Sequence, residues 1–261
     1  MHDRYTNRER YFNEQVFTTR NYVIPYLKGV MDIKEETIVA EIGCGEGGNL
    51  LPFLDLGCKI IGIDLAANKI KNAKVFFDNH PNKHLATFIA EDIYKVNPAD
   101  YPQFDLIIMR DTIEHIPNQK VFLKNLKQFL SPTGKVFFAF PPWRMPFGGH
   151  QQTCRSRFLS KLPYFHLLPI FFYRGTLKLF GESQQTIDSL LEIKDTGISI
   201  RRFERIVTSS CYSINKKTYF MVNPNYEIKF KLKTRVLPEI MNIPYFRDFF
   251  TTAMYCVISK N

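Results

Sequence analysis

Five short apolar runs, each followed by a helical segment or a long crossover, lie between residues 37 and 140. The runs cover residues 37–42, 59–63, 84–90, 104–109 and 135–140, and helices are predicted over 49–56, 68–78 and 118–130. Runs of this length without a polar face are typical of strands that are buried on both sides. Strands joined by crossovers pair in parallel, and the crossovers cover both faces of the sheet. The pattern therefore predicts an α/β, doubly wound sheet.

The first predicted strand ends in a glycine-rich turn, EIGCGEGG, at residues 41–48. Gly43, Gly45 and Gly48 satisfy the pattern G-x-G-x-x-G between a strand and a helix, where a tight turn and a close ligand both require glycine. Asp64 ends the second predicted strand, where a carboxylate can accept hydrogen bonds from ribose hydroxyls. Together these features indicate a site for an adenosine-containing cofactor at the carboxyl edge of the sheet.

Further segments, in the same order along the chain, resemble the class I S-adenosylmethionine-dependent methyltransferases. Glu41 in VAEIGCGEGG, Asp64 in IIGIDLA and Asp92 in AEDI match the acidic residues of that family. The segment FDLIIMRDTIEHIP looks like the fourth-strand region of small-molecule methyltransferases such as those of quinone biosynthesis, and LKQFLSPTGKVFF resembles the helix, glycine turn and fifth strand. Strands predicted over 218–222 and 252–259 fit the terminal hairpin of the family, in which strand seven runs antiparallel between strands five and six.

The resemblance implies a mostly parallel, seven-stranded, Rossmann-like methyltransferase fold with an antiparallel last strand. It also implies an enzyme that uses S-adenosyl-L-methionine and releases S-adenosyl-L-homocysteine. The cofactor site would comprise Glu41, Gly43, Cys44, Gly45, Gly47, Asp64, Leu65, Asp92, Ile93 and Arg110. In this interpretation the amides of residues 43–45 face the methionine portion and Glu41 orients the loop, or the cofactor ammonium through a water. Asp64 then holds the ribose, and Asp92 with Ile93 flanks the adenine.

The resemblance covers most of the chain, so a single methyltransferase domain is predicted for residues 1–261. Helices are expected over 5–28 and 198–210, and residues 141–197, rich in proline and aromatic side chains, are interpreted as an inserted helical cap. The parts are therefore N-terminal helices (1–36), the cofactor-binding core (37–140), the cap and substrate insertion (141–197), and the final helix and strands (198–261).

Methyl transfer needs a nucleophile aligned with an electrophilic methyl group, and a base helps when the acceptor is a hydroxyl or a protonated amine. Arg110 and Asp111 follow the fourth strand, where the methyl group would be presented; a local ion pair between them is the alternative. The predicted catalytic residues are Asp111, His115 and His150, and no metal site is predicted. For His115 the alternative is packing against the cofactor or capping of a short helix.

His150 lies in the loop PPWRMPFGGHQQ after the fifth strand, which would overhang the pocket. Trp143, Phe147 and the Gly148-Gly149 pair are interpreted as a lid with a hinge, in preference to an ordinary surface loop.

The net positive charge of the chain lies in its second half. Residues 1–140 carry 17 basic and 17 acidic side chains, whereas residues 141–261 carry 18 and 8. Within the insertion, RFLSKLPYFHLLPIFFYRGTLKLF mixes apolar side chains with four cations, Arg157, Lys161, Arg174 and Lys178. Such a segment suits a cap that buries one face on the sheet, which we favour, or a contact with anionic membrane. Either would give the pocket an apolar wall and a basic rim, so a hydrophobic or phosphate-bearing acceptor is expected, such as a quinone precursor or a lipid-linked sugar.

Three other functions are compatible with parts of this pattern. An RNA methyltransferase fits the basic half, although the chain has no Asn-Pro-Pro-Tyr-like tetrapeptide after the fourth strand and no RNA-binding module that we recognise. A nicotinamide-dependent oxidoreductase would share the glycine loop, but Glu41 and the terminal hairpin argue against it. The third alternative is a protein that binds the cofactor but catalyses no reaction.

Three features of the chain predict a cytoplasmic location. The first 15 residues are polar where a signal peptide would be apolar. The longest predominantly apolar stretch, residues 162–173, is shorter than the ~20 residues of a membrane span. Five cysteines are an odd number without a Cys-x-x-Cys pair, which favours reduced thiols. The oligomeric state is not predicted.

Overall fold

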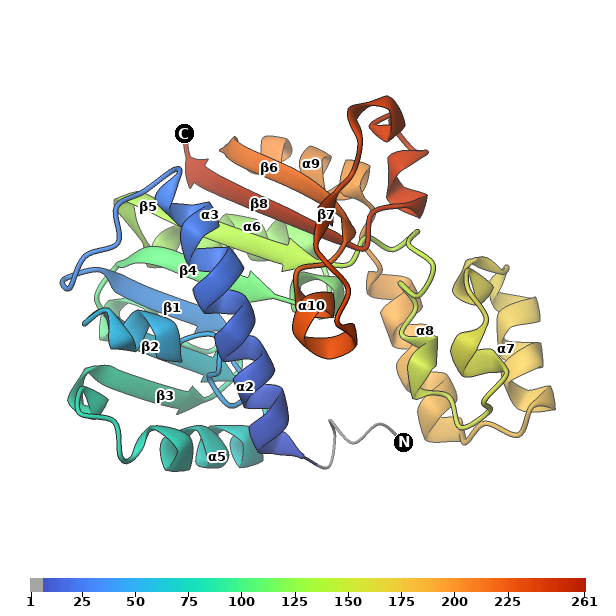
Figure 1. Ribbon diagram of the computed structural model, residues 1–261, viewed down its shortest axis with the longest axis horizontal. Helices are drawn as coiled ribbons and strands as arrows, with labels where there is room; N and C mark the ends of the chain where they lie inside the picture. Colours follow the sequence, from blue (N-terminus) through green and yellow to red (C-terminus); the bar gives the residue numbers. More distant parts are fainter. Residues whose placement is uncertain (1–6) are drawn as a thin grey trace.

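A single eight-stranded sheet, in the order β3-β2-β1-β4-β5-β8-β6-β7, organises the chain in our computed structural model, which describes residues 7–261 (Figure 1). The strands are β1 (Ile38–Ile42), β2 (Lys59–Asp64), β3 (Ala86–Ala90), β4 (Phe104–Arg110), β5 (Leu130–Phe140), β6 (Tyr212–Val222), β7 (Arg235–Val236) and β8 (Ala253–Lys260). The strands from β1 to β5 pair in parallel, and β8 runs antiparallel between β5 and β6. The predicted fold class is confirmed.

The sheet differs from the prediction in length and in one edge strand. A two-residue strand, β7, pairs with the end of β6 and makes an eighth strand where seven were expected. It was missed because Arg235 and Val236 follow polar residues and are themselves exposed. β6 starts at Tyr212, six residues earlier than predicted, because its first half alternates buried and exposed side chains instead of forming an apolar run.

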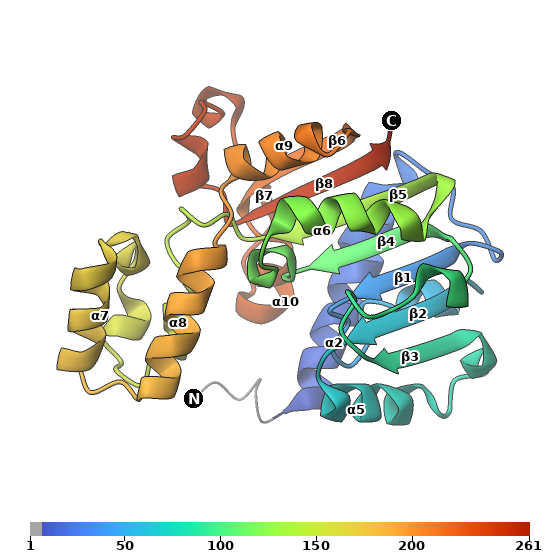
Figure 2. The ribbon, with the colours of Figure 1, turned by 180° about the vertical axis from the view of Figure 1, so that it is seen from behind.

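Helices cover both faces of the sheet, and each face has its own core. On one face lie α6 (Gln119–Leu126) and α9 (Ile200–Ser209), whose Phe122 and Phe203 are buried against β4 and β5 (Figure 2). The other face is covered by α2 (Arg8–Thr18), α3 (Ile24–Lys28), α4 (Leu51–Asp55) and α5 (Ala67–Phe77). A π-helical turn, Thr19–Val23, joins α2 to α3. The first residues of the helix predicted over 5–28 lie outside the described part of the chain.

The insertion forms a helical lobe beyond the carboxyl ends of the parallel strands (Figures 1 and 2). It contains α7 (Ile170–Leu179), α8 (Gln184–Thr196) and the 3₁₀ turns Gln151–Thr153, Leu159–Lys161 and Phe165–Leu167. Its buried cluster consists of Cys154, Leu159, Phe165, Tyr173, Leu177, Ile187 and Leu190. The expectation that the cap buries an apolar face on the sheet is therefore wrong, because α7 and α8 bury their apolar stripes against each other.

The remaining segments are short. α10 (Asn225–Phe230) lies between β6 and β7, where no convincing helix was expected, and 3₁₀ turns span Lys83–Leu85, Pro98–Asp100, Ile113–His115, Lys127–Phe129, Glu239–Met241 and Arg247–Phe249. Within residues 7–261, none of the helices has the length and apolarity needed to cross a membrane. All five cysteines are free thiols.

Candidate active site

The glycine loop has left-handed backbone at Gly43, Gly45 and Gly47, with φ of +77°, +56° and +80°. A Cβ atom at Gly43 would lie 2.6 Å from Thr112 Oγ1, so this glycine is required by packing as well as by its backbone. Among residues 7–261, a Cβ atom at Gly45 would meet only Lys69 Cδ, at 3.9 Å, although Gly45 itself is buried. Packing of the described residues therefore leaves space beside the backbone of Gly45.

Gly48 serves a different purpose from the one that the G-x-G-x-x-G pattern suggested. A Cβ atom at this position would lie 2.6 Å from the carbonyl oxygen of Phe12, so glycine allows α2 to cross close over the loop. The third left-handed position of the turn is Gly47 instead.

The backbone amides of the loop are engaged within the protein. Gly43 and Cys44 donate to the carbonyl oxygen of Ile63 at 2.8 and 3.1 Å, and Gly45 donates to Asp64 Oδ2 at 2.8 Å. The expectation that these three amides face a ligand is wrong, because the loop folds back onto the end of β2. The side chain of Cys44 is fully buried, so this residue supports the loop from beneath.

Asp64, at the carboxyl end of β2, connects the loop to the start of α5. Its Oδ1 accepts from the amide of Ala66 at 2.8 Å, and its Oδ2 accepts from Gly45. A carboxylate has about four lone-pair positions, so both oxygens can accept further bonds. The next side chain, Leu65, is 75% exposed and offers an apolar surface beside the acid.

Asp92 and Ile93 follow β3 at the same edge of the sheet, and both are half-buried. Asp92 Oδ1 accepts from the amide of Tyr94 at 3.0 Å. The carboxyl ends of β1, β2 and β3 thus gather the predicted nucleotide-binding residues, as a parallel sheet requires.

Glu41 lies under the loop in a buried polar network. Its side chain is fully buried and accepts from Asn49 Nδ2 at 2.5 Å, while Oε2 has no partner among the described residues. Burial raises the pKa of Glu41 to about 8, an effect that the hydrogen bond from Asn49 and the charge of Arg110 oppose. Glu41 therefore fixes Asn49, the residue after the loop, which agrees with an orienting role.

Arg110 belongs to the same network. Its Nη1 donates to Asn49 and, at 3.3 Å, to Thr19 Oγ1. The guanidinium therefore points toward α2 and the π-helical turn, so these bonds replace the local ion pair with Asp111 considered above. Thr19 and Asn49 were not identified from the sequence, because neither forms part of a recognisable motif.

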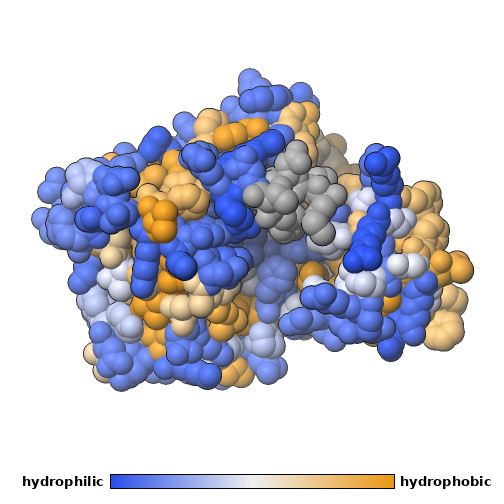
Figure 3. All heavy atoms as spheres, turned by 90° about the horizontal axis from the view of Figure 1, so that it is seen from below, coloured by the Kyte–Doolittle hydropathy of each residue, from blue (hydrophilic) through white to orange (hydrophobic). Residues whose placement is uncertain are grey.

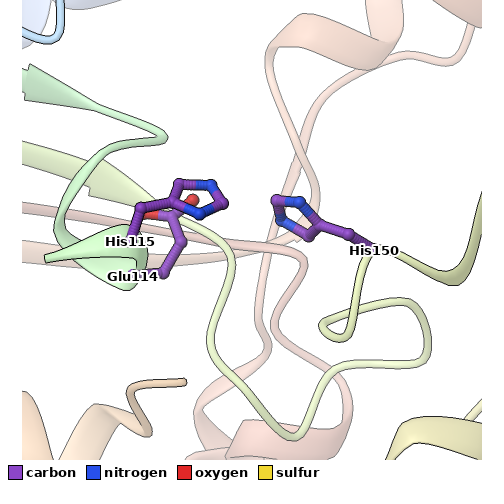
Figure 4. A group of neighbouring side chains, drawn as sticks. All are labelled: Glu114, His115 and His150. Carbon is purple, nitrogen blue, oxygen red and sulfur yellow. The ribbon is translucent and has the colours of Figure 1, made fainter. Parts of the chain in front are cut away.

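The predicted catalytic histidines meet across two segments that are distant in sequence (Figure 4). His115 comes from the 3₁₀ turn after β4 and His150 from the loop after β5, and their ring centroids are 5.0 Å apart in an edge-to-face arrangement. The pKa of His150 is lowered to about 4, mainly by burial and in smaller part by the neighbouring His115 and His166. Burial also lowers the pKa of His115, against the opposing charges of Asp111 and Glu192. Both imidazoles are therefore neutral near pH 7.

Glu114 joins the two histidines and was not identified from the sequence. It is 3% exposed, and burial, together with the charge of Asp111, raises the pKa of its carboxyl group. One possible ligand atom from each of Glu114, His115 and His150 lies within 4.8 Å of the others. The spacing Asp111-x-x-Glu114-His115 was the available signal, since a carboxylate directly before a histidine brings two ligand types to one turn.

The loop that carries His150 is packed tightly. A Cβ atom at Gly148 would lie 2.4 Å from the carbonyl oxygen of Trp143, and one at Gly149 would lie 2.1 Å from His166 Cβ. Both glycines therefore permit close packing, which differs from the expected hinge. His166 is itself fully buried, and its Nε2 lies 2.7 Å from the carbonyl oxygen of Trp143.

A parallel sheet with an antiparallel strand beside β5, and a glycine loop backed by buried Glu41, defines the class I S-adenosylmethionine-dependent methyltransferase fold. Solved structures of this class share the architecture. Magnesium protoporphyrin IX methyltransferase from Synechocystis PCC 6803, with bound S-adenosylhomocysteine, superposes with a TM-score of 0.56 and 13% identity, over 95% of this chain and 84% of that one. The plantazolicin methyltransferase BpumL, in complex with a triazolic desmethylPZN analogue and S-adenosylhomocysteine, gives a TM-score of 0.56 at 16% identity, over 99% of this chain and 89% of that one. At such identities the likeness establishes the fold.

The chain belongs to the methyltransferase-domain family, because the family model described as "Methyltransferase domain" matches residues 12–164. A ubiquinone biosynthesis O-methyltransferase of Rhodopseudomonas palustris (strain BisB5) is 33% identical over 100 residues, 38% of each chain. The sterol 4-C-methyltransferase strm-1 of Caenorhabditis elegans is 29% identical over 105 residues, 40% of this chain and 31% of that protein. The match thus spans less than half the length of these curated relatives.

Proposed function

We propose that this protein transfers the methyl group of S-adenosyl-L-methionine to a small-molecule acceptor. The observation that carries the proposal is a juxtaposition at one edge of the sheet. The glycine loop and Asp64 lie at the carboxyl ends of β1 and β2, and His115 with His150 lies beyond β4 and β5. A nucleotide cofactor held by the first pair of strands would therefore direct its reactive end toward the two imidazoles.

The residues at this edge fit the proposed cofactor. Asp64 keeps free acceptor capacity for ribose hydroxyls, and the exposed Leu65 offers an apolar surface to the adenine. The described residues also leave space beside the backbone of Gly45. Asp92 and Ile93 complete the adenine side in our proposal. Glu41 and Arg110, fixed through Asn49, hold the loop from behind.

When bound, S-adenosylmethionine supplies an electrophilic methyl group, so the protein must mainly position the acceptor and exclude water. His115 and His150 are neutral, and a neutral imidazole can accept a proton from an acceptor hydroxyl or ammonium group. Asp111, exposed at the end of β4 with a left-handed φ of +50°, lies close enough to His115 to oppose the fall of the pKa of that residue. We propose that these three residues face the acceptor.

The acceptor that we propose is a hydrophobic or phosphate-bearing small molecule, such as a quinone precursor or a lipid-linked sugar. The cap stands over the site and carries both apolar side chains and cations, which supports this class. The test is a screen of such acceptors with methyl-labelled S-adenosylmethionine and the full chain. We expect label in the organic-soluble acceptors; labelling of RNA in their place, or binding of NAD in place of S-adenosylmethionine, would contradict the proposal.

The outer surface of the cap also supports a peripheral contact with anionic lipid. Apolar side chains that are at least 39% exposed gather there: Phe158, Leu168, Ile170, Phe171, Phe172, Leu179 and Phe180. Exposed cations lie among them, namely Arg157, Lys161, Arg174 and Lys178. Figure 3 shows apolar atoms at the outer margin of the cap lobe. This combination is what an interfacial segment uses to bind a negatively charged membrane surface.

The membrane contact can be tested by sedimentation with vesicles that contain anionic phospholipid. We expect salt-sensitive binding that the double variant Phe171→Ser/Leu179→Ser weakens by at least about tenfold, because burial of each such side chain contributes about 1.5–3 kcal/mol. Ile240→Ser is the matched control, since Ile240 is 85% exposed but lies outside the cap. Equal binding of the double variant and this control would contradict the proposed surface.

A further inference from the structure

Three potential metal ligands converge at the entrance to the cap. Glu114, His115 and His150 each place a ligand atom within 4.8 Å of the other two (Figure 4). The three side chains come from two segments, the 3₁₀ turn Ile113–His115 after β4 and the loop after β5. Two imidazoles and one carboxylate form a donor set that proteins use for divalent first-row metals such as zinc.

The carboxylate of Glu114 is buried without hydrogen-bond partners in the described part of the chain. Only 3% of the residue is exposed, and neither carboxylate oxygen has a hydrogen-bond partner. Burial of a carboxyl group without partners costs free energy, so native structures rarely leave one in this state. A cation bound beside the two histidines would give one of these oxygens a partner.

The second segment is held in place independently of any metal. Gln151, which follows His150, is fully buried and donates to the carbonyl oxygens of Pro146 and Leu162 at 3.0 and 3.2 Å. The backbone of His150 is left-handed, with φ of +55°, and its amide donates to Phe147 at 3.2 Å. These contacts direct the imidazole of His150 toward His115.

We propose that Glu114, His115 and His150 bind one divalent first-row transition-metal ion, such as Zn²⁺ or Mn²⁺, and that the open coordination position takes an oxygen of the acceptor. This inference deepens the proposed function and rests on it for the role of the ion. It replaces the expectation of no metal site, and it makes His115 and His150 ligands of the ion instead of acceptors of the proton. Because the ligands come from the core and from the cap loop, the ion would link the two parts at the place where the methyl group is delivered. The acceptor class narrows to molecules with a hydroxyl or carboxylate oxygen.

Metal binding is testable without an acceptor. The full chain, freed of metal by a chelator, is titrated with Zn²⁺, Mn²⁺ and Mg²⁺ by calorimetry, and its thermal melting is followed in parallel. We expect one Zn²⁺ or Mn²⁺ per chain and a raised melting temperature, because the ion binds the folded state. Glu114→Gln should weaken binding by about 100-fold or more, since loss of even an outer-shell partner costs 10–100-fold. Thermal melting of the metal-free Glu114→Gln protein shows separately that the variant is folded.

His80→Ala is the matched control, since His80 lies beside a carboxylate, Asp55, at 3.1 Å but outside the cluster. Metal binding should be unchanged in this variant. Absence of one-site binding, equal binding by Glu114→Gln, or binding of Mg²⁺ alone would overturn the inference. S-adenosylmethionine binding is measured separately on the metal-free protein. If S-adenosylmethionine binds and the metal does not, the proposed function stands and the metal site is rejected. If the metal binds and S-adenosylmethionine does not, the metal site is supported and the proposed function is rejected.

Discussion

His150→Asn is expected to lower the turnover of methyl transfer by about 10²–10⁴-fold, with little change in the affinity for S-adenosylmethionine. This is the usual contribution of a positioned acid or base, and a loss in the same direction is expected if His150 binds the ion that holds the acceptor. Asparagine is chosen because it tolerates the left-handed backbone that His150 adopts, at φ of +55°. The loop should keep its structure, because His150 bonds to Phe147 and Thr153 through its own backbone. The loss should therefore appear in the rate and not in cofactor binding.

The measurement is single-turnover transfer of labelled methyl to the acceptor found by the screen, with cofactor affinity determined by calorimetry. His84→Asn is the matched control. His84 is exposed and precedes β3, at the opposite end of the strand from the site. The His84→Asn variant should therefore transfer methyl at the wild-type rate. If His150→Asn and His115→Asn both transfer methyl at the wild-type rate, neither imidazole takes part in the reaction.

Asp64→Ala is expected to weaken the binding of S-adenosylmethionine and S-adenosylhomocysteine by about 1–3 kcal/mol, or about 5–150-fold. The ribose hydroxyls would lose a charged acceptor. The glycine loop would also lose the bond that Gly45 makes to Asp64 at 2.8 Å. Asp64→Asn should lose less cofactor affinity than Asp64→Ala, because one side-chain oxygen remains to accept a hydrogen bond from the backbone.

Calorimetric titration of the wild type, Asp64→Asn and Asp64→Ala with S-adenosylhomocysteine tests whether affinity falls in that order. Asp78→Ala serves as the control, because Asp78 is an exposed residue after α5 that pairs with Lys83 at 2.9 Å. Thermal melting of each variant separates weaker binding from unfolding. An unchanged affinity in folded Asp64→Ala would remove Asp64 from the site and, with it, the nucleotide orientation that we propose.

The alternation of apolar runs and helices was sufficient to predict the core of the sheet. β1, β2, β4 and the second half of β5 are buried on both faces, and such strands are readable because nearly every residue of the run is apolar. β3, at the edge of the sheet, buries only Phe88. The left-handed turns at Gly43 and Gly45, and the carboxylate of Asp64 that receives the Gly45 amide, are equally local. Local backbone and periodicity signals of this kind depend on neighbours within a few residues.

Properties that depend on distant packing were not predictable in this way. Gly48 is required by the carbonyl oxygen of Phe12, Arg110 turns toward Thr19, and the cap helices bury their apolar stripes on each other instead of on the sheet. The edge strand β7 exists only because β6 extends beside it. Gly48 and Arg110 are distant in sequence from these partners, and although α7 and α8 are consecutive helices, whether they pack on each other or on the sheet depends on where the cap lies in the fold.

The candidate catalytic site shows most clearly which properties follow from the sequence and which follow from tertiary packing. The sequence by itself determined that His115 follows β4 and that His150 follows β5, so both had to lie at the carboxyl edge of a parallel sheet. Only the tertiary structure decided that their rings lie 5.0 Å apart and that Glu114, whose carboxylate has no hydrogen-bond partner within residues 7–261, lies beside them. The strand order directs both loops to one edge, but the distance between side chains depends on how the loop after β5 packs against the cap, which no local pattern encodes.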